Sequence, residues 1–249
     1  MNGPDPEPSP PVPLWERTRI IIGEQGIERL RGSHVLLAGL GGVGSFAAEA
    51  LARVGVGRLT LADCDVVAPS NLNRQLVALK STLGRKKVEV MAARIADINP
   101  HCRLTQIDSF LQAEEMPVLL ERPFDYVVDA IDSLNSKVSL IATALERGIP
   151  VAASMGAGGR MDPTRLVVGD LMDSEVCPLA RVVRRRLRRR GVGRGVLAVW
   201  STETPCAPLP PEAVGQGRPR AINGTVSYLP ALFGMTLAGS VIQRLLSRA

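Results

Sequence analysis

The stretch Val35-Leu36-Leu37-Ala38-Gly39-Leu40-Gly41-Gly42-Val43-Gly44 decides the fold of this chain. It opens with four apolar residues without alternation, a run typical of a parallel strand that is covered on both faces. The pattern Gly39-x-Gly41-x-x-Gly44 follows, and residues 45–52 are typical of a helix. A glycine turn between a strand and a helix is the setting in which phosphate oxygens meet the N–H groups of a helix N-terminus. The stretch predicts a nucleotide-binding turn, and the alternative is a tight turn without a ligand.

Two carboxylates follow the next predicted strand. Residues 58–62 predict that strand, and Asp63 and Asp65 come directly after it. Asp63 lies about 20 residues beyond the glycines, the spacing at which a carboxylate meets the ribose of a bound nucleotide. The glycine turn and this strand end together give as candidate nucleotide ligands Gly39, Gly41, Gly42, Gly44, Asp63 and Asp65.

Strands and helices alternate along the first two thirds of the chain. Further strands are predicted at residues 104–107, 124–130 and 149–153, and helices at residues 26–31, 84–98 and 136–147. This alternation predicts an α/β fold with a doubly wound, Rossmann-like mixed sheet. Asp132 follows the fourth strand, so we expect it at the carboxyl edge of the sheet, where ligands bind in such folds.

The remaining segments complete one domain. We expect a disordered proline-rich arm over residues 1–13, a nucleotide-binding core over residues 14–155, and a C-terminal extension over residues 156–249 that forms the substrate and dimer region. The extension contains predicted strands at 166–169 and 196–200, a helix at 177–190, a mobile loop at 205–220 and an apolar helix at 228–246. Trp200 and Tyr228 lie in apolar runs and are expected in the core.

The composition indicates the kind of partner and the cellular compartment of this chain. The formal net charge is +6, which suits a polyanionic partner or simply a basic surface. The four cysteines form no C-x-x-C pair, which favours reduced thiols in a cytoplasm over a zinc site or a disulfide framework. Residues 228–246 approach the length of a membrane span, but the segment contains Pro230, Gly234 and Gly239, so we expect a buried helix and no membrane.

The charged residues favour ATP over a nicotinamide cofactor. Hydride transfer needs a proton donor or acceptor, and the only histidines, His34 and His101, are poorly placed for it. Two cations, Arg74 and Lys87, follow the ribose carboxylate and suit a triphosphate, while Asp132 suits magnesium. Arg17 is a further candidate cation. The alternative for each cation alone is a solvated surface charge.

Several motifs together resemble the ThiF-type adenylating domain of ubiquitin-activating-like enzymes. They are Gly39 to Gly44, Asp63-x-Asp65, Ser70-Asn71-Leu72-Asn73-Arg74-Gln75, Lys87-Val88-Glu89 and Asp129-x-x-Asp132. The resemblance implies that Asp63 binds the ribose, that Asn71, Arg74 and Lys87 contact phosphates, and that Asp132 binds magnesium. Arg17 is similar to an arginine that enters the partner subunit's site, which implies a homodimer. Leu14 stands where the family often has another arginine.

Within that superfamily the chain resembles the tRNA threonylcarbamoyladenosine dehydratase branch. The likeness lies in residues 156–164, Asp170-Leu171, Ser201-Thr202-Glu203 and Leu229-Pro230-Ala231. It implies ATP-dependent cyclisation of threonylcarbamoyladenosine at position 37 of tRNA, through adenylation of the threonyl carboxylate. The implied partners are the modified tRNA and a second copy of the chain, and a cysteine-desulfurase or sulfur-acceptor partner is left open.

Two features keep alternatives open. The arginines Arg181, Arg184, Arg185 and Arg188 fall near one face of the predicted helix, which favours tRNA binding over a merely solvated face. Cys177 and Cys206 lie where a carrier-protein activator would place an acyl-accepting thiol, although free cysteines are usually inert. The other hypotheses are therefore an adenylating enzyme for a ubiquitin-like or sulfur-carrier protein, and a nucleotide-binding scaffold without catalysis.

Overall fold

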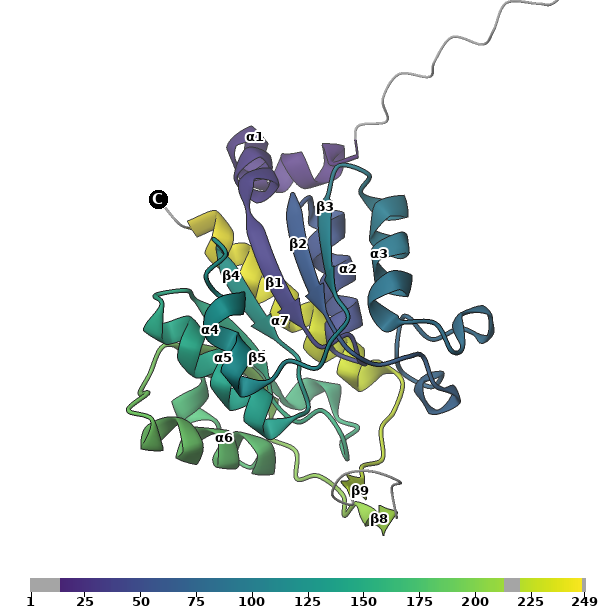
Figure 1. Cartoon of the computed structure of the whole chain (residues 1–249), viewed down its shortest axis with the longest axis vertical. Coiled ribbons are helices and arrows are strands. Elements are labelled where there is room, and N and C mark those ends of the chain that lie inside the picture. The colour runs from purple at the N-terminus through teal and green to yellow at the C-terminus, as the bar shows by residue number, and fades with distance from the viewer. Residues whose placement is uncertain (1–13, 213–219, 248–249) are drawn as a thin grey trace, which may run out of the picture.

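A seven-stranded sheet in the order β3-β2-β1-β4-β5-β7-β6 forms the centre of the molecule (Figure 1). The computed structural model describes residues 14–212 and 220–247. Six strands are parallel, and β6 runs antiparallel to β7 at the edge. The strands are β1 (His34–Ala38), β2 (Arg58–Ala62), β3 (Arg103–Ile107), β4 (Tyr126–Asp129), β5 (Val151–Ser154), β6 (Leu166–Asp170) and β7 (Val196–Ser201). The predicted doubly wound mixed sheet is confirmed.

Helices cover both faces of the sheet. The α-helices are α1 (Glu16–Gly32), α2 (Gly44–Val54), α3 (Lys87–Ile98), α4 (Met116–Leu119), α5 (Leu134–Glu146), α6 (Pro178–Arg189) and α7 (Tyr228–Ser247). In β1, Val35 and Leu37 pack into a core with α2, α3 and α7, whereas Leu36 and Ala38 pack into a second core with α4, α5 and α6. This two-sided burial is why the first strand shows no alternation in the sequence.

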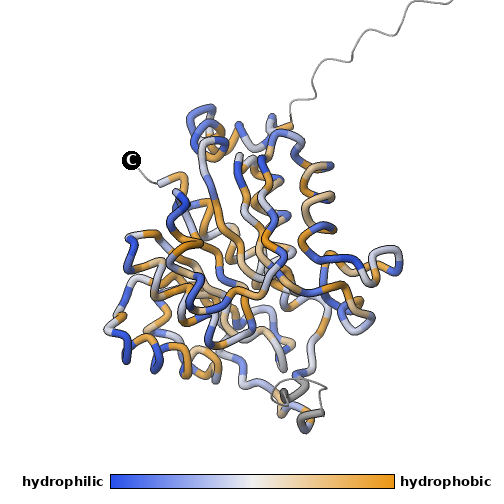
Figure 2. Tube along the Cα trace, viewed as in Figure 1, coloured by the Kyte–Doolittle hydropathy of each residue, from blue (hydrophilic) through white to orange (hydrophobic). Residues whose placement is uncertain are grey.

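Close packing of α7 on α2 explains the apolar C-terminal segment. One face of α7, with Leu229, Phe233 and Leu237, is buried in the core beside α2. A Cβ atom at Gly234 would lie 2.3 Å from the Val43 carbonyl oxygen, so the glycine permits this approach. α7 is long and apolar enough to cross a membrane by length and composition alone. Its buried face fits the predicted core helix, and Figure 2 shows the hydrophobic stretches gathered in the interior.

Three local predictions need correction. The predicted helix at 26–31 is only the end of α1, which begins at Glu16 and kinks at Gly23, where φ is 70°. The predicted loop at 205–220 contains strand β8 (Leu209–Glu212), which pairs with β9 (Arg220–Ile222) at the end of that segment. Residues 213–219, like the predicted arm at 1–13, lie outside the described residues. Trp200 is buried as predicted, but Tyr228 is 42% exposed because its hydroxyl donates to the Met161 carbonyl oxygen at 2.7 Å.

Candidate active site

The glycine turn forms one wall of a cavity of about 490 Å³ at the carboxyl edge of the sheet. Gly39 has a φ of 92°, and a Cβ atom there would lie 2.6 Å from the Ala130 carbonyl oxygen. At Gly44 a Cβ atom would lie 1.7 Å from the Gly39 carbonyl oxygen, so α2 and β1 pack as closely as glycine allows. Within the described residues, no side chain caps the N-terminus of α2. The turn therefore directs a helix N-terminus, which favours anions, towards the cavity.

The four glycines differ in what the fold requires of them. At Gly41 the nearest atom to a Cβ would be Gln75 Nε2, at 3.8 Å, and the backbone has no positive φ. Gly41 lines the cavity, so its lack of a side chain leaves room for a ligand. Gly42 and Gly44 do not line the cavity; Gly42 faces Pro230, and Gly44 separates α2 from β1.

The carboxylates after β2 and a lysine from α3 meet in this cavity. Asp63 accepts hydrogen bonds from the backbone N–H groups of Leu40, at 2.6 Å, and Asp65, at 2.9 Å. Burial raises the pKa of Asp63, while the nearby Lys87 ammonium acts in the opposite direction. Lys87 is only 4% exposed, and its Nζ pairs with Asp65 Oδ2 at 2.7 Å. Asp65 therefore holds Lys87 in place, and Asp63 links its strand to the glycine turn.

The segment after β2 adds Asn71, Arg74 and Gln75 to the lining. Asn71 is buried, and its Oδ1 accepts from the Ala68 N–H at 3.0 Å. Arg74 Nη1 donates to the Ser70 carbonyl oxygen and to Asn73 Oδ1, both at 2.8 Å. Gln75 Oε1 is buried without a hydrogen-bond partner among the described residues. Gln75 ends the motif that begins at Ser70, but no sequence pattern predicts a role for it.

Sequence reasoning also missed the apolar wall and the support of Asp132. Phe110 and Leu111 follow β3 and line the cavity; their position after a predicted strand was the available signal. Asp129, at the end of β4, pairs with Lys137 of α5 at 2.6 Å, and both side chains are fully buried. This pair anchors the turn that carries Asp132 into the cavity, so Asp129 is structural within the motif.

A second cavity, of about 620 Å³, adjoins the first. Arg74, Ala130, Ile131 and Asp132 line both cavities. Its far wall includes Arg160, which is 3% exposed and donates from Nε to the Glu203 carbonyl oxygen at 2.9 Å and from Nη1 to the Gly156 carbonyl oxygen at 2.6 Å. Cys177, also buried, lies in the same wall. A ligand in each cavity would therefore meet the other beside Arg74 and Asp132.

The remaining predicted residues lie elsewhere. Arg17 lies on α1, and α1 leads into the amino end of β1 (Figure 1). Arg17 lines neither cavity. On α6, Arg181, Arg185 and Arg188 are exposed, whereas Arg184 is partly buried and donates to the Ser174 carbonyl oxygen. Arg17 and the α6 arginines are thus separate from the sites near the glycine turn.

Comparison with known proteins identifies the family to which this chain belongs. A family model described as the ThiF family matches residues 16–249. The chain belongs to the ThiF family. This ThiF-family protein is 40% identical to the tRNA threonylcarbamoyladenosine dehydratase of Bacillus subtilis, over 93% of this chain and 94% of the relative. It is 37% identical to the Escherichia coli protein of the same name, over 93% of each.

A solved structure matches nearly the whole chain. The crystal structure of the E. coli tRNA N6-threonylcarbamoyladenosine dehydratase in complex with ATP has a TM-score of 0.84 against this ThiF-family protein. The two sequences are 38% identical, and the match covers 93% of each chain. The predicted family and fold are confirmed.

Proposed function

We propose that this ThiF-family protein uses ATP to cyclise threonylcarbamoyladenosine at position 37 of tRNA. The observation that carries the proposal is the junction of two cavities at Arg74 and Asp132. The first cavity suits a nucleotide in size and lining, and the second offers a path by which a carboxylate reaches its α-phosphate. The names of relatives that match nearly end to end support this choice of substrate.

ATP is proposed to lie across the carboxyl edge of the sheet. Asp63 holds the ribose, and the glycine turn receives the phosphates at the N-terminus of α2. Arg74 and Lys87 supply positive charge beside the phosphates, and Asn71 supplies an amide at the same side of the cavity. Phe110 and Leu111 provide an apolar wall for the base.

Magnesium is compatible with the residues in this cavity. Among the described residues no three His, Cys, Asp or Glu side chains gather as a metal cluster. Magnesium usually takes only one or two protein carboxylates and completes its shell with phosphates and water, so Asp132 suffices. When bound, magnesium would offset part of the negative charge on the phosphates.

The reaction follows in two steps. A threonyl carboxylate oxygen attacks the α-phosphorus, an acyl–phosphate bond forms, and pyrophosphate leaves. A nucleophile within the modified side chain then attacks the acyl carbon, loses its proton, and displaces AMP with the carboxylate oxygen. In both steps the protein positions the reactants and stabilises developing charge. It need not form a covalent bond to the substrate, because the second nucleophile belongs to the substrate. The buried Arg160 gives the second cavity a positive wall towards which an incoming carboxylate is drawn.

The exposed arginines of α6 are proposed to contact tRNA. Ala180, Val183 and Leu187 are buried on the face of α6 that packs near α5, which leaves Arg181, Arg185 and Arg188 outside. Figure 2 shows the hydrophilic outer side of this helix. Contacts with phosphates dominate the affinity of proteins for tRNA, so these arginines are suited to bind the phosphate backbone of the tRNA.

Replacing Arg181, Arg185 and Arg188 together with alanine is expected to weaken tRNA binding. The slope of log affinity against log salt should become shallower by about 2, since each phosphate contact contributes roughly 0.7 to 0.9. Filter binding over a salt series measures this. The control is Lys80→Ala/Arg244→Ala, which removes two exposed cations that line none of the cavities. An unchanged slope in the α6 variant would remove this helix from the tRNA interface.

The cysteines distinguish the proposal from carrier-protein activation. Cys206 is exposed, and Cys177 is buried in the second cavity. Burial raises the pKa of Cys102 to about 11, so that thiol stays neutral. We expect Cys177→Ala/Cys206→Ala to retain most cyclisation, because the route needs no enzyme thiol. Loss of product with retained ATP–pyrophosphate exchange would favour an acyl-thioester route instead.

A homodimer is part of the proposal. Arg17 lies on α1, beyond the amino ends of the strands, so it would act in the cavity of a second copy. Ile20 and Ile21 on the same helix are 82% and 85% exposed, an apolar surface consistent with such contact. We expect the reaction to take place in the cytoplasm; a desulfurase or sulfur-acceptor partner stays a prediction of the sequence.

Pyrophosphate exchange tests the function directly. Labelled pyrophosphate should enter ATP only when threonylcarbamoyl-modified tRNA is present, since the carboxylate must be adenylated first. Exchange that instead needs a small protein with a glycine tail would support the carrier-protein hypothesis. ATP binding without exchange under either condition would support a scaffold.

A further inference from the structure

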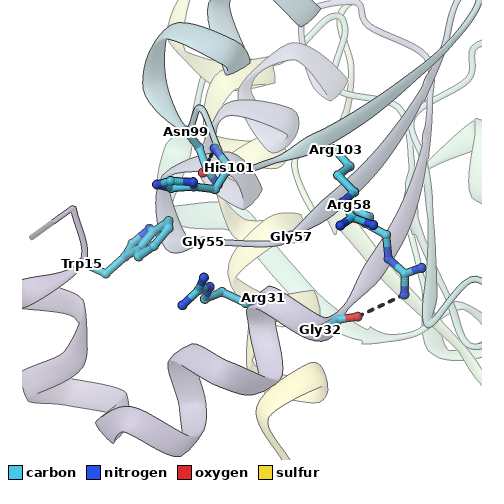
Figure 3. A pocket seen from close by; sticks show the side chains of 9 residues that line it. All are labelled: Trp15, Arg31, Gly32, Gly55, Gly57, Arg58, Asn99, His101 and Arg103. Atoms are coloured by element: carbon cyan, nitrogen blue, oxygen red, sulfur yellow. Dashed lines mark hydrogen bonds between the residues drawn. The ribbon is translucent and has the colours of Figure 1, made fainter. Parts of the chain in front are cut away.

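A cationic pocket, drawn in Figure 3, lies at the amino edge of the sheet and shares no lining residue with the two cavities. Its volume is about 350 Å³, and its side chains include Trp15, Arg31, Arg58, His101 and Arg103. Arg58 and Arg103 open β2 and β3, whereas the glycine turn and Asp63 lie at the carboxyl ends. Strands of five residues separate the two edges by about 16 Å. The pocket is therefore distinct from the proposed ATP site.

Glycines bring the backbone close to the aromatic ring in this pocket. Gly55 has a φ of 101°, and a Cβ atom there would lie 2.9 Å from the indole Nε1 of Trp15. At Gly57 a Cβ atom would lie 1.8 Å from the Arg31 carbonyl oxygen. The turn between α2 and β2 is thus packed tightly against the segments that carry Trp15 and Arg31. This packing gives the pocket a rigid floor.

Three arginines concentrate positive charge in the pocket. None of the ion pairs within the described residues includes Arg31, Arg58 or Arg103. Arg58 Nη2 donates to the Gly32 carbonyl oxygen at 3.2 Å, which holds the guanidinium beside the pocket. Trp15 is 8% exposed, and its Nε1–H has no hydrogen-bond partner in the part of the chain that the structure describes. The Nε1 atom is itself covered by the turn at Gly55, so the gathered guanidinium groups are what favours an anion here.

The arrangement of the rings selects a phosphate over a nucleobase. The Arg31 guanidinium lies over the Trp15 ring, 5.9 Å from its centroid. His101 lies on the same ring with centroids 6.3 Å apart and an interplanar angle of 51°. Trp15 is only 8% exposed, so its indole offers little open face for a base to stack on. Guanidinium groups match phosphate oxygens well.

We propose that this pocket binds a backbone phosphate of the RNA substrate. The inference rests on the proposed function for its choice of RNA over a free phosphate. The starts of β2 and β3, which carry Arg58 and Arg103, lie at the opposite end of the molecule from α6 (Figure 1). A long polyanion spans that separation, and a mononucleotide does not. A backbone phosphate positions the RNA without reading its sequence, so the pocket orients the tRNA while the cavities carry the chemistry.

Trp15 itself reports on the pocket. The chain has two tryptophans, so Trp200→Phe leaves Trp15 as the sole indole fluorophore. An anticodon stem–loop RNA and, separately, inorganic phosphate are titrated into the full-length protein. The expected result is a saturable change in Trp15 fluorescence with RNA. Adding Arg103→Glu should abolish that change, whereas Arg244→Glu, at an exposed cation outside the pocket, should preserve it.

Filter binding provides the second measurement. Arg103→Glu is expected to weaken RNA binding about tenfold, because a phosphate contact becomes a repulsion. Arg103 is exposed at the start of an edge strand, so its replacement leaves the core intact, and the melting temperature checks this. Equal losses of RNA affinity in Arg103→Glu and Arg244→Glu would overturn the proposal that this pocket binds RNA. A Trp15 fluorescence that responds neither to RNA nor to phosphate would overturn it as well.

The two proposals fail separately. A response to millimolar phosphate with none to RNA would keep an anion site and overturn RNA as its source. ATP–pyrophosphate exchange is measured on the same variants with modified tRNA. Absence of exchange in the unmutated protein would contradict the proposed function, while the Trp15 response would still decide whether the pocket binds RNA.

Discussion

Asp132→Ala is expected to reduce ATP–pyrophosphate exchange by roughly a thousandfold, the scale of losing a group that stabilises transition-state charge. Asp132 lines both cavities at their junction, where the α-phosphate and the incoming carboxylate are proposed to meet. It is exposed, so its replacement should leave the fold unchanged. Exchange is measured over a magnesium series, because a lost metal ligand shifts the magnesium requirement to higher concentrations.

Asp97→Ala is the matched control for this result. Asp97 is an exposed carboxylate on α3 that lines neither cavity. Its removal changes the net charge by the same amount as Asp132→Ala, so a general electrostatic effect would appear in both variants. If Asp132→Ala retains pyrophosphate exchange with an unchanged dependence on magnesium, Asp132 is not part of the site.

Gly44→Ala and Gly41→Ala are expected to separate folding from ligand binding within one turn. At Gly44 the new Cβ would overlap the Gly39 carbonyl oxygen at 1.7 Å, so α2 must move away from β1. We expect a loss of about 3 kcal/mol or more in the free energy of unfolding. A loss of that size lowers the melting temperature by roughly 10 °C in a chain of this length. Thermal unfolding measures it.

Gly41→Ala should behave in the opposite way. The nearest atom to its Cβ is Gln75 Nε2 at 3.8 Å, an ordinary contact, so the melting temperature should change little. The methyl group enters the cavity where phosphate is proposed to lie and would displace it. Displacing the phosphate in this way can lower the exchange rate about a hundredfold. A stable Gly41→Ala protein with normal ATP binding would contradict the proposed position of the phosphates.

Part of the site was predictable because local patterns carry it. The strand and glycine turn can be predicted from residues 35–44 because buried strands need unbroken apolar runs and close packing needs glycine. Asp63, Arg74, Lys87 and Asp132 were predicted near one another and do line one cavity. Gln75, Phe110 and Leu111 were not predicted, because glutamine and apolar residues have no distinctive spacing.

Contacts between distant segments decide the placement of other side chains. Tyr228 was predicted to be buried because its neighbours are apolar, but a hydrogen bond to Met161 holds it at the surface. The four arginines of α6 share a face in the sequence, yet Arg184 turns to Ser174 and leaves that surface. A helical pattern gives the angle at which a side chain leaves the helix, but the neighbouring element determines what it meets.

The sequence by itself determined the doubly wound sheet and the turn that begins α2, because strand burial and backbone sterics act within a few residues. Only the tertiary structure decided that the two cavities join at Arg74 and Asp132, and that Trp15, Arg58 and His101 form a pocket at the opposite edge. Those juxtapositions depend on strand order and helix packing. They join residues far apart in the chain, and no local pattern records which segments become neighbours.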